Sequence, residues 1–510
     1  MAIHWRSYLI LLVFCCHILH DQVLAQEKPV WSENFEHFDP SRTIPGKVGQ
    51  ALNLTRTASK RTPLSFALPS STFGNSFSLT CWVKGEPDFE RYSIIDLLFT
   101  YPDSTTASWS IQKQVNQSWA WKYQQGEKEL LYEGSHKSQP IHKDWNLLAM
   151  LVNLNKEEVT LYYNQQQVAI YSLEGVLKKG TVQQVQLTIA GETRGELSEW
   201  ESFNGQIDEV NIYSGLLSKE AIQAYYEKHQ QGYLKKEAIT PTDTLRIMSF
   251  NIWHGGNETG KAFGYERIAQ LIKDAKADIV AMQETYGSGA KIAAELGYYF
   301  YLRSTNISIL SRYPIIETLA AYKPFNNGNA YIQLGRDTIA VACVWLNYPI
   351  DYWANIENNK KMDIQEWQKL QLGNTNSMRG IIQALKSPLE RSEDIPVFIC
   401  GDFNSGSHLD YVEATRYRNG GYNMPFPTSL YLDSLGFRDT YRERYPDPVK
   451  NPGTTWSPIH PKVHQDRIDY IYLKNKRLQL IDSRIIDASK EKYPSDHAAV
   501  MSTFLFPQKP

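Results

Sequence analysis

The pattern of hydrophobic residues changes near residue 240, and this change constrains the fold more than any other feature of the chain. Before it, short runs such as "SFSLTCWVKG" and "EVTLYYN" alternate apolar with polar residues over the length of a strand. After it, helical patterns such as "YERIAQLIKDAKA" alternate with nearly continuous apolar runs such as "IPVFIC". Alternation is typical of antiparallel sheets, whereas continuous apolar strands between helices indicate sheets that are covered by helices. We therefore expect an all-β domain over 29–228, a polar linker over 229–243 and an α/β domain over 244–508.

The first 25 residues have the features of a secretory signal peptide. A basic start and an apolar stretch of about a dozen residues precede Val23-Leu24-Ala25, which is a typical cleavage site. The apolar stretch is too short to span a bilayer, and no later segment approaches the roughly 18 apolar residues of a transmembrane helix. We therefore expect cleavage after Ala25 and a secreted or periplasmic protein without a transmembrane segment.

The cysteines and the net charge bear on two further properties, disulfide bonding and nucleic-acid binding. Cys81, Cys343 and Cys400 follow the predicted cleavage site and lie in apolar, strand-like contexts, which favours buried free thiols over a disulfide framework. The net charge is −2, and the sequence has no basic stripe of the kind that follows a nucleic-acid backbone. The charge pattern therefore gives little support to a dedicated nucleic-acid binder.

The first half resembles a known fold family. "GKVGQALNL", "FSLTCWVKG", "DWNLLAMLVN", "VTLYYNQQQV" and "FNGQIDEVNIYSGLLSKEAI" look like the concanavalin A-like, or laminin-G-like, jelly roll in the expected order. A turn at Asn164-Gln165 and a helix capped by Ser218 agree with this fold. Asp208 is either a calcium ligand or a structural acid. Trp200 and Phe203 are either sugar-stacking residues or core residues. The fold alone does not decide between a glycan ligand, another surface ligand and an inert spacer.

In the second half, polar and acidic residues follow or precede apolar strands. They are expensive to desolvate at the ends of buried strands unless they share a function. This set comprises Asn251, Glu284, Asp402, Asn404, Asp469, Asp496 and His497. Each residue alone has an ordinary structural explanation, such as a turn, a helix cap or an ion pair. Their common placement predicts that they meet at one edge of the sheets.

The order of these residues resembles that of the endonuclease/exonuclease/phosphatase superfamily, also called DNase I-like. The resemblance rests on "MSFNIW", "MQE", "ILSRYPI", "GDFN", "RIDYIY" and "SDH", and it covers essentially the whole second half. It implies a four-layer α/β sandwich in which two facing sheets are covered by helices on their outer sides. It also implies a phosphoester hydrolase that depends on Mg²⁺, with Mn²⁺ as a possible substitute.

The resemblance assigns a role to each residue. Glu284 would be the principal metal ligand and Asp496 would assist it, since hard cations prefer carboxylate oxygens. Asn251 would hold Glu284 or the water network. Asp402 would orient or deprotonate the attacking water. Further roles fall to three other residues: Asn404 would bind the phosphate, His497 would stabilise the transition state, and Asp469 would orient His497. His254 is a further candidate at the same edge.

One departure from the family pattern concerns the proton donor to the leaving group. Nuclease-like members have a histidine, or in some a tyrosine, after the strand that corresponds to "AVACVWLNYP", where this chain has no histidine. Asn347 or Tyr348 occupies that position. Tyr348 is the candidate acid because it has a hydroxyl group, and water is the alternative.

These observations predict a secreted phosphodiester hydrolase whose substrate is a small molecule, a phospholipid headgroup or a nucleic acid. The near-neutral second half and the aromatic segment "YPIDYWANIENNKKMDIQEW" favour a compact pocket. A secreted endonuclease acting on DNA or RNA is the alternative within the same class. A carbohydrate- or protein-binding protein with a non-catalytic second half is the alternative from another class. Retention of the acidic residues and His497 argues against that last reading.

Overall fold

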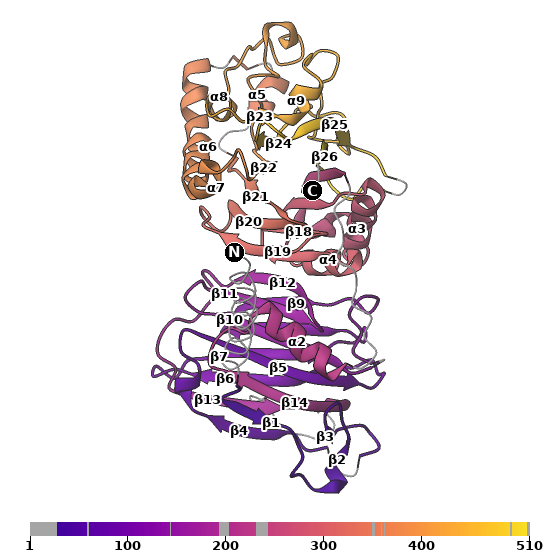
Figure 1. The fold of residues 1–510 in the computed structure, drawn as a ribbon. Helices are drawn as coiled ribbons and strands as arrows, with labels where there is room; N and C mark the ends of the chain where they lie inside the picture. Colours follow the sequence, from indigo (N-terminus) through magenta and orange to yellow (C-terminus); the bar gives the residue numbers. More distant parts are fainter. Residues whose placement is uncertain are drawn as a thin grey trace, which may run out of the picture. The chain divides into compact units, whose positions relative to one another are not determined.

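The computed structural model describes residues 28–58, 61–142, 144–192, 203–230, 243–348, 352–358, 360–361, 363–489 and 492–506. The predicted signal peptide over 1–25, most of the predicted linker and Trp200 lie outside these residues. The chain forms two compact units, one N-terminal and one C-terminal (Figure 1). Within the described part, no helix has both the length and the apolar character needed to cross a membrane.

The N-terminal unit is a sandwich of two β-sheets. In the first sheet the order is β2-β3-β14-β5-β10-β11-β12, and β1 pairs with β14. Its strands are β1 (Trp31–Glu33), β2 (Thr43–Pro45), β3 (Gln50–Asn53), β5 (Ser76–Gly85), β10 (Asn146–Asn153), β11 (Glu158–Tyr163), β12 (Gln166–Ser172) and β14 (Gly205–Tyr213). The second sheet has the order β4-β13-β6-β7-β8-β9, and all its neighbouring strands are antiparallel. Its strands are β4 (Leu64–Leu68), β6 (Tyr92–Thr100), β7 (Thr106–Lys113), β8 (Trp119–Gln125), β9 (Lys128–Glu133) and β13 (Gln184–Ile189). This arrangement confirms the predicted jelly roll.

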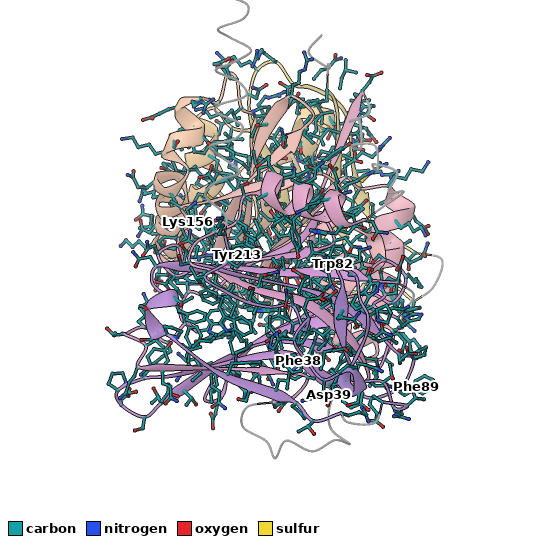
Figure 2. The ribbon with its side chains drawn as sticks, turned by 60° about the horizontal axis from the view of Figure 1, so that its bottom comes forward. Phe38, Asp39, Trp82, Phe89, Lys156 and Tyr213 are labelled. Atoms are coloured by element: carbon teal, nitrogen blue, oxygen red, sulfur yellow. The ribbon has the colours of Figure 1, made fainter. Side chains whose placement is uncertain are left out.

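Aromatic side chains fill the space between these two sheets. Phe77 of β5 meets Trp109 of β7 edge to face, with ring centroids 5.8 Å apart. Phe203 is fully buried, so it is a core residue and not a sugar platform. Figure 2 shows Trp82 within the unit, whereas Phe89, 86% exposed, lies at its edge. The alternating pattern therefore identified the buried face of the sandwich.

Two local predictions for this unit are confirmed. Asn164 has a φ of 57° between β11 and β12, as a tight hairpin turn requires. Helix α2 (Lys219–His229) begins at Ser218, whose side chain accepts a hydrogen bond from the Ala221 backbone N–H. The helix covers the outer face of the first sheet, where Tyr226 stacks on Trp82 at 5.6 Å.

Asp208 has the contacts of a structural acid. Its two carboxylate oxygens accept hydrogen bonds from the backbone N–H groups of Val48 and Glu209, each at 2.8 Å. It thereby fastens the turn between β2 and β3 to β14. Burial raises the pKa of Asp208 to about 7.

We expect Asp208→Ala to destabilise the N-terminal unit by about 1–3 kcal/mol, because two backbone donors lose their acceptor. The folded pKa lies above the unfolded value, so this carboxyl group contributes most stability below about pH 4, and the contribution is lost as the pH rises through about 7. The cost of the substitution should therefore be larger at pH 5 than at pH 7 in urea unfolding followed by tryptophan fluorescence. An equal cost at both pH values, or stabilisation of the wild type by added Ca²⁺, would contradict this role.

The C-terminal unit contains two sheets with helices on their outer faces. The first sheet has the order β17-β18-β16-β15-β26-β25, and the second has the order β19-β20-β21-β22-β24-β23. The first consists of β15 (Thr244–Asn251), β16 (Ile279–Gln283), β17 (Tyr299–Leu302), β18 (Ile307–Ser311), β25 (Gln479–Ile486) and β26 (Ala499–Leu505). The second consists of β19 (Ile315–Leu319), β20 (Asn327–Leu334), β21 (Asp337–Trp345), β22 (Val397–Asp402), β23 (Arg438–Asp439) and β24 (Asp469–Lys474). The strands β15 and β16 run parallel, as do β21 and β22.

A continuous apolar core joins these two sheets. Phe398 of β22 meets Phe504 of β26 with ring centroids 5.3 Å apart, and Ile247, Val341 and Cys343 are fully buried in the same cluster. Cys81 and Cys400 are buried as well, and all three described cysteines are free thiols, as predicted. The apolar runs are therefore strands that are buried on both faces.

Helices complete the predicted four-layer sandwich. They are α3 (Gly264–Ala275), α4 (Gly289–Leu296), α5 (Tyr352–Glu357), α6 (Ile364–Ala384), α7 (Lys386–Glu390), α8 (Pro427–Ser434) and α9 (Thr440–Arg444). Figure 1 shows α3 and α4 on one side of the unit and α6, α7 and α8 on the other. Met378 and Ile381 of α6 pack on the outer face of the second sheet. Because helices cover the outer faces of both sheets, the ends of the strands are the accessible place for a site.

Candidate active site

The polar residues predicted from the sequence converge at one edge of the two sheets. Asn251 ends β15 and Glu284 directly follows β16, its parallel neighbour in the first sheet. Asp402 ends β22 and lies opposite Asp469, the first residue of β24, in the second sheet. His497 lies two residues before β26. The strand order therefore brings together groups that are up to 246 positions apart in the sequence.

Asn251 connects the two sheets. Its side-chain N–H₂ group lies 3.1 Å from Glu284 Oε1 and 3.1 Å from Asp402 Oδ2. Its side-chain oxygen accepts a hydrogen bond from the Trp253 backbone N–H at 3.1 Å. Because the residue is fully buried and all three contacts are made, its amide orientation is fixed. Asn251 thus holds one carboxylate from each sheet: the contact with Glu284 is the one expected from the sequence, and the contact with Asp402 was not foreseen.

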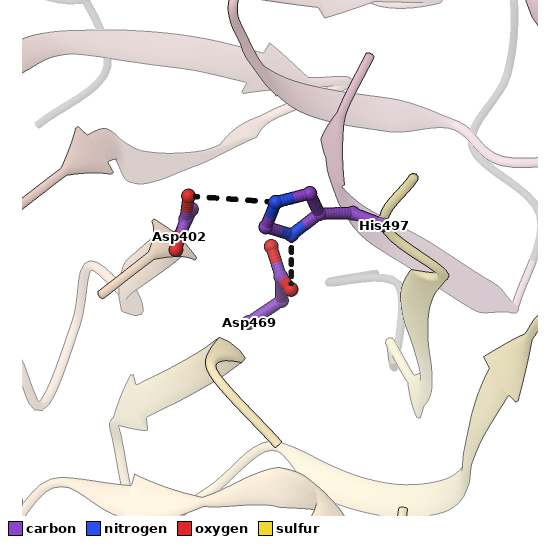
Figure 3. Close-up of side chains that lie close together, drawn as sticks. All are labelled: Asp402, Asp469 and His497. Atoms are coloured by element: carbon purple, nitrogen blue, oxygen red, sulfur yellow. Dashed lines mark hydrogen bonds and ion pairs between the residues drawn. The ribbon is translucent and has the colours of Figure 1, made fainter. Parts of the chain in front are cut away.

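His497 lies between two aspartates (Figure 3). Its Nδ1 is 2.9 Å from Asp469 Oδ2, and its Nε2 is 4.0 Å from Asp402 Oδ2. Burial lowers the pKa of His497, but the two carboxylates more than offset this effect and raise it to about 10. His497 is therefore an imidazolium at neutral pH, with Asp469 fixing the orientation of its ring.

Asp402 is a buried carboxyl group with two amide neighbours. The Asn404 backbone N–H donates to Oδ1 at 2.8 Å, and the Asn404 side chain lies 3.2 Å from Oδ2. Burial raises the pKa of Asp402 to about 7, against the opposing attraction of His497. The Asn404 amide also donates to the Leu346 carbonyl at 2.9 Å, so its hydrogens already have protein acceptors. In this structure Asn404 positions Asp402, and its contact with a phosphate stays a prediction.

Glu284 and Asp496 both line the same cleft and are the candidate residues for a cation site. Glu284 has a left-handed φ of 57°, and its Oε2 accepts a hydrogen bond from the His254 backbone N–H at 3.1 Å. Asp496 is 7% exposed, and its Oδ1 has no hydrogen-bond partner within the described residues. Burial raises the pKa of Asp496; His497 opposes this shift, and the charge of Glu284 adds to it. A buried carboxylate oxygen without a donor, beside a second carboxylate, fits a hard divalent cation such as Mg²⁺.

Asp402, Asp469 and His497 form a second group of metal-ligating types, since their donor atoms lie within 4.8 Å of one another. Both nitrogens of His497 already face these carboxylates, and a protonated imidazole has no lone pair for a metal. The trio is therefore better explained as a charge-assisted hydrogen bond between His497 and Asp469 together with an ion pair between His497 and Asp402. The donor set of Glu284 and Asp496 remains the one that suits a cation.

Glu284, Asp402, Asn404, Asp496 and His497 line a cleft of about 310 Å³ whose remaining wall is largely aromatic. The wall includes Trp345, Tyr348, Trp353 and Trp456. Tyr348 is 44% exposed, and its ring stacks on Trp353 with centroids 5.1 Å apart. The structure therefore places Tyr348 in the cleft, beside the acidic residues, and Asn347 does not line it in the described part of the chain.

His254, the further candidate from the sequence, lines the cleft as well, whereas two other features of the cleft were not foreseen. His254 lies at its rim with Nδ1 3.1 Å from Glu258 Oε1 and Nε2 3.6 Å from Glu284 Oε2. The tryptophans of the wall come from separate segments, and of these only Trp353 lies in the aromatic segment "YPIDYWANIENNKKMDIQEW". Asp466, which accepts a hydrogen bond from Trp353 of this wall, was not among the candidates from the sequence.

Comparisons with known proteins agree with this architecture. A model of the endonuclease/exonuclease/phosphatase family matches residues 248–497, and a model of the concanavalin A-like lectin/glucanases superfamily matches residues 62–223. An uncharacterized protein of Caenorhabditis elegans is 31% identical over 303 residues, which cover 53% of this chain and 94% of that protein. The chain thus combines a concanavalin A-like domain with a following domain of the endonuclease/exonuclease/phosphatase family.

Solved structures are similar to parts of this chain at low identity. A humanized D. rerio TDP2 shares 19% identity, over 52% of this chain and 99% of its own, with a TM-score of 0.36. The human nocturnin catalytic domain, with bound sulfate, shares 16% identity over 52% of this chain and 94% of its own, with a TM-score of 0.35. A pentraxin from Limulus polyphemus shares 12% identity over 34% of this chain and 79% of its own, with a TM-score of 0.27.

Proposed function

We propose that this protein is a secreted or periplasmic, Mg²⁺-dependent phosphodiester hydrolase in which water attacks phosphorus. The observation that supports this most strongly is the position of Asn251, whose amide joins the Glu284 carboxylate to the Asp402 carboxylate at 3.1 Å each. A cation-binding acid and a candidate base are thereby held at a fixed separation beside an imidazolium. This combination suits an ester whose phosphorus gains negative charge during attack.

Each group of the cleft has a defined task in this proposal. Asp402 orients the attacking water and accepts its proton, for which a pKa near the working pH is well suited. The Nε2–H of His497 donates to a phosphoryl oxygen while Nδ1–H stays with Asp469 at 2.9 Å. Asn251 and Asn404 keep Asp402 in place. Glu284 and Asp496 would hold Mg²⁺, or Mn²⁺ in its place. The bound cation would neutralise charge on the phosphoryl oxygens.

The lining of the cleft favours a small molecule or a phospholipid headgroup over a nucleic acid as substrate. Among the described residues that line it, none is lysine or arginine, whereas neutralising several backbone phosphates requires such cations. The N-terminal domain would bring the enzyme to a glycan or another surface ligand, which raises the local concentration of substrate.

Three substrates test the proposal with the purified protein and Mg²⁺: bis-p-nitrophenyl phosphate, sphingomyelin vesicles and supercoiled DNA. We expect turnover of the small diester and weak or no nicking of DNA. Efficient nicking without small-diester turnover would favour the endonuclease alternative. Lack of activity on all three would favour a binding protein with a non-catalytic second half.

Tyr348→Phe should slow hydrolysis of a diester with an alkyl leaving group by about 10²-fold, because an alkoxide needs a proton as it departs. Nitrophenolate leaves without a proton, so the same substitution should have little effect on bis-p-nitrophenyl phosphate. The two rates are compared as kcat/KM under identical conditions. Equal losses on both substrates would assign Tyr348 to phosphate positioning, and no loss on either would leave water as the acid.

A further inference from the structure

Three aromatic rings form a stack that ends in the candidate cleft. Tyr348 lies on Trp353 with centroids 5.1 Å apart and an interplanar angle of 11°, and Trp353 lies on Tyr352 at 4.5 Å and 34°. Tyr352 is fully buried and Trp353 is 8% exposed, whereas Tyr348 is 44% exposed. Exposure therefore increases along the stack toward the cleft that Tyr348 and Trp353 line.

Asp466 fixes this stack from behind. Its Oδ2 accepts hydrogen bonds from the Tyr352 hydroxyl at 2.8 Å, from Trp353 Nε1–H at 3.1 Å and from the Tyr411 hydroxyl at 2.8 Å. Its Oδ1 accepts a hydrogen bond from the Arg467 backbone N–H at 2.8 Å. Because the indole N–H of Trp353 points to Asp466, the polar edge of that ring is satisfied within the protein. These hydrogen bonds hold Tyr352 and Trp353 in place, and none of the four involves the Tyr348 ring.

The same residue ties the stack to the reacting groups. The backbone of Asp466 pairs with Trp456, and Trp456 also forms a backbone bridge with His497. The Trp456 ring meets the His497 ring edge to face at 5.0 Å. The aromatic stack and the imidazolium are therefore linked to one another through the partly buried Trp456. A group bound on Tyr348 would have a defined position relative to the phosphorus.

We propose that Tyr348, supported by Trp353, Tyr352 and Asp466, is a stacking surface that selects phosphodiesters carrying a planar aromatic or heteroaromatic ring close to the phosphorus. The inference rests on the proposed phosphodiesterase function and adds the chemistry of the substrate. Stacking on a rigid ring gains contact area with little loss of side-chain freedom. Asp466 offers no spare acceptor to a cationic ligand, because it is 5% exposed and already accepts four hydrogen bonds. The other carboxylates of the cleft, Glu284, Asp402 and Asp496, have their own tasks in the proposed reaction.

Binding of two phosphonates measures this preference independently of turnover, since hydrolysis does not cleave their C–P bonds. Phenylphosphonate and methylphosphonate are titrated into the full chain with Mg²⁺ by calorimetry. We expect the phenyl compound to bind about tenfold more tightly or better, which is the usual scale of one aromatic stacking contact. Equal affinities in the wild type would overturn the inference. Tighter binding of trimethylammonioethyl phosphonate than of phenylphosphonate would also overturn it, in favour of a cation site.

Variants of Tyr348 separate ring stacking from simple apolar contact. Tyr348→Phe retains a ring and should keep the preference for phenylphosphonate, whereas Tyr348→Leu should bring the affinity ratio close to one. Phe263→Leu is the matched control, because Phe263 is 59% exposed in the same unit and does not line the cleft. An unchanged ratio in Tyr348→Leu would overturn the inference. Ring preference without hydrolysis of bis-p-nitrophenyl phosphate would refute the proposed function alone, and hydrolysis without ring preference would refute the inference alone.

Discussion

Glu284→Gln is expected to lower kcat/KM for bis-p-nitrophenyl phosphate by about 10³-fold or more. The reason is that charge neutralisation by a bound cation contributes several kcal/mol to the transition state. Glutamine keeps the size of the side chain and can still accept the hydrogen bond from the His254 backbone, but it lacks the charge that holds Mg²⁺. Calorimetric titration with Mg²⁺ should show weaker binding in the variant, and a chelator should abolish the hydrolytic activity of the wild type. Calcium should substitute poorly because Mg²⁺ sites demand a tighter, octahedral arrangement.

Glu390→Gln provides the matched control for this substitution. Its side chain is 65% exposed on α7, away from the cleft, and its loss of charge should leave both Mg²⁺ binding and turnover unchanged. Thermal unfolding of both variants near the wild-type temperature would show that the fold is retained. Full activity in the presence of a chelator, or equal Mg²⁺ affinity in Glu284→Gln and the wild type, would refute the assignment of Glu284.

His497→Ala should reduce kcat by about 10²–10³-fold, which is the usual effect of removing one charged or polar donor from a transition-state site. The imidazolium lies between Asp469 and Asp402, so its removal also leaves two buried carboxylates without their common partner. Steady-state kinetics on bis-p-nitrophenyl phosphate measure the loss. KM should change less than kcat, because the donor acts on charge that develops during the reaction.

A double-mutant cycle tests whether Asp469 acts through His497. Asp469→Asn alone should reduce kcat less than His497→Ala does, because the imidazole remains but its orientation and charge are less well held. Once His497 has been replaced by alanine, adding Asp469→Asn should cost little more, since the two residues act as one unit. Fully additive losses would show that Asp469 has a separate task.

The position of the site could be predicted because its signals are local. Each acidic or amide residue directly follows or precedes a buried strand, and strand order places those ends at one edge. Asn251, Glu284 and Asp402 therefore meet as the sequence pattern indicated, although their distances could not be foreseen. The jelly roll and the four-layer sandwich follow from the two hydrophobic patterns in the same way.

The features that sequence analysis left open depend on contacts between distant segments. The choice between a calcium ligand and a structural acid at Asp208 depends on the Val48 backbone N–H, which donates to the Asp208 carboxylate from 160 positions away. The pattern alone could not show that the Asn404 side-chain amide donates to the Leu346 carbonyl, 58 positions earlier in the chain. The aromatic stack requires Asp466 to reach Tyr352 and Trp353, more than 110 positions before it. No local pattern encodes such pairings.

The most direct test of the central claim is hydrolysis of bis-p-nitrophenyl phosphate by the purified chain in ¹⁸O-labelled water with Mg²⁺. We expect ¹⁸O in the p-nitrophenyl phosphate product and none in the released nitrophenol, because water attacks phosphorus. We also expect this labelled product to be nearly lost in Asp402→Asn, which retains the shape of the side chain but cannot accept the proton. Absence of labelled phosphate product from the wild type, or an equal yield from Asp402→Asn, would contradict the account.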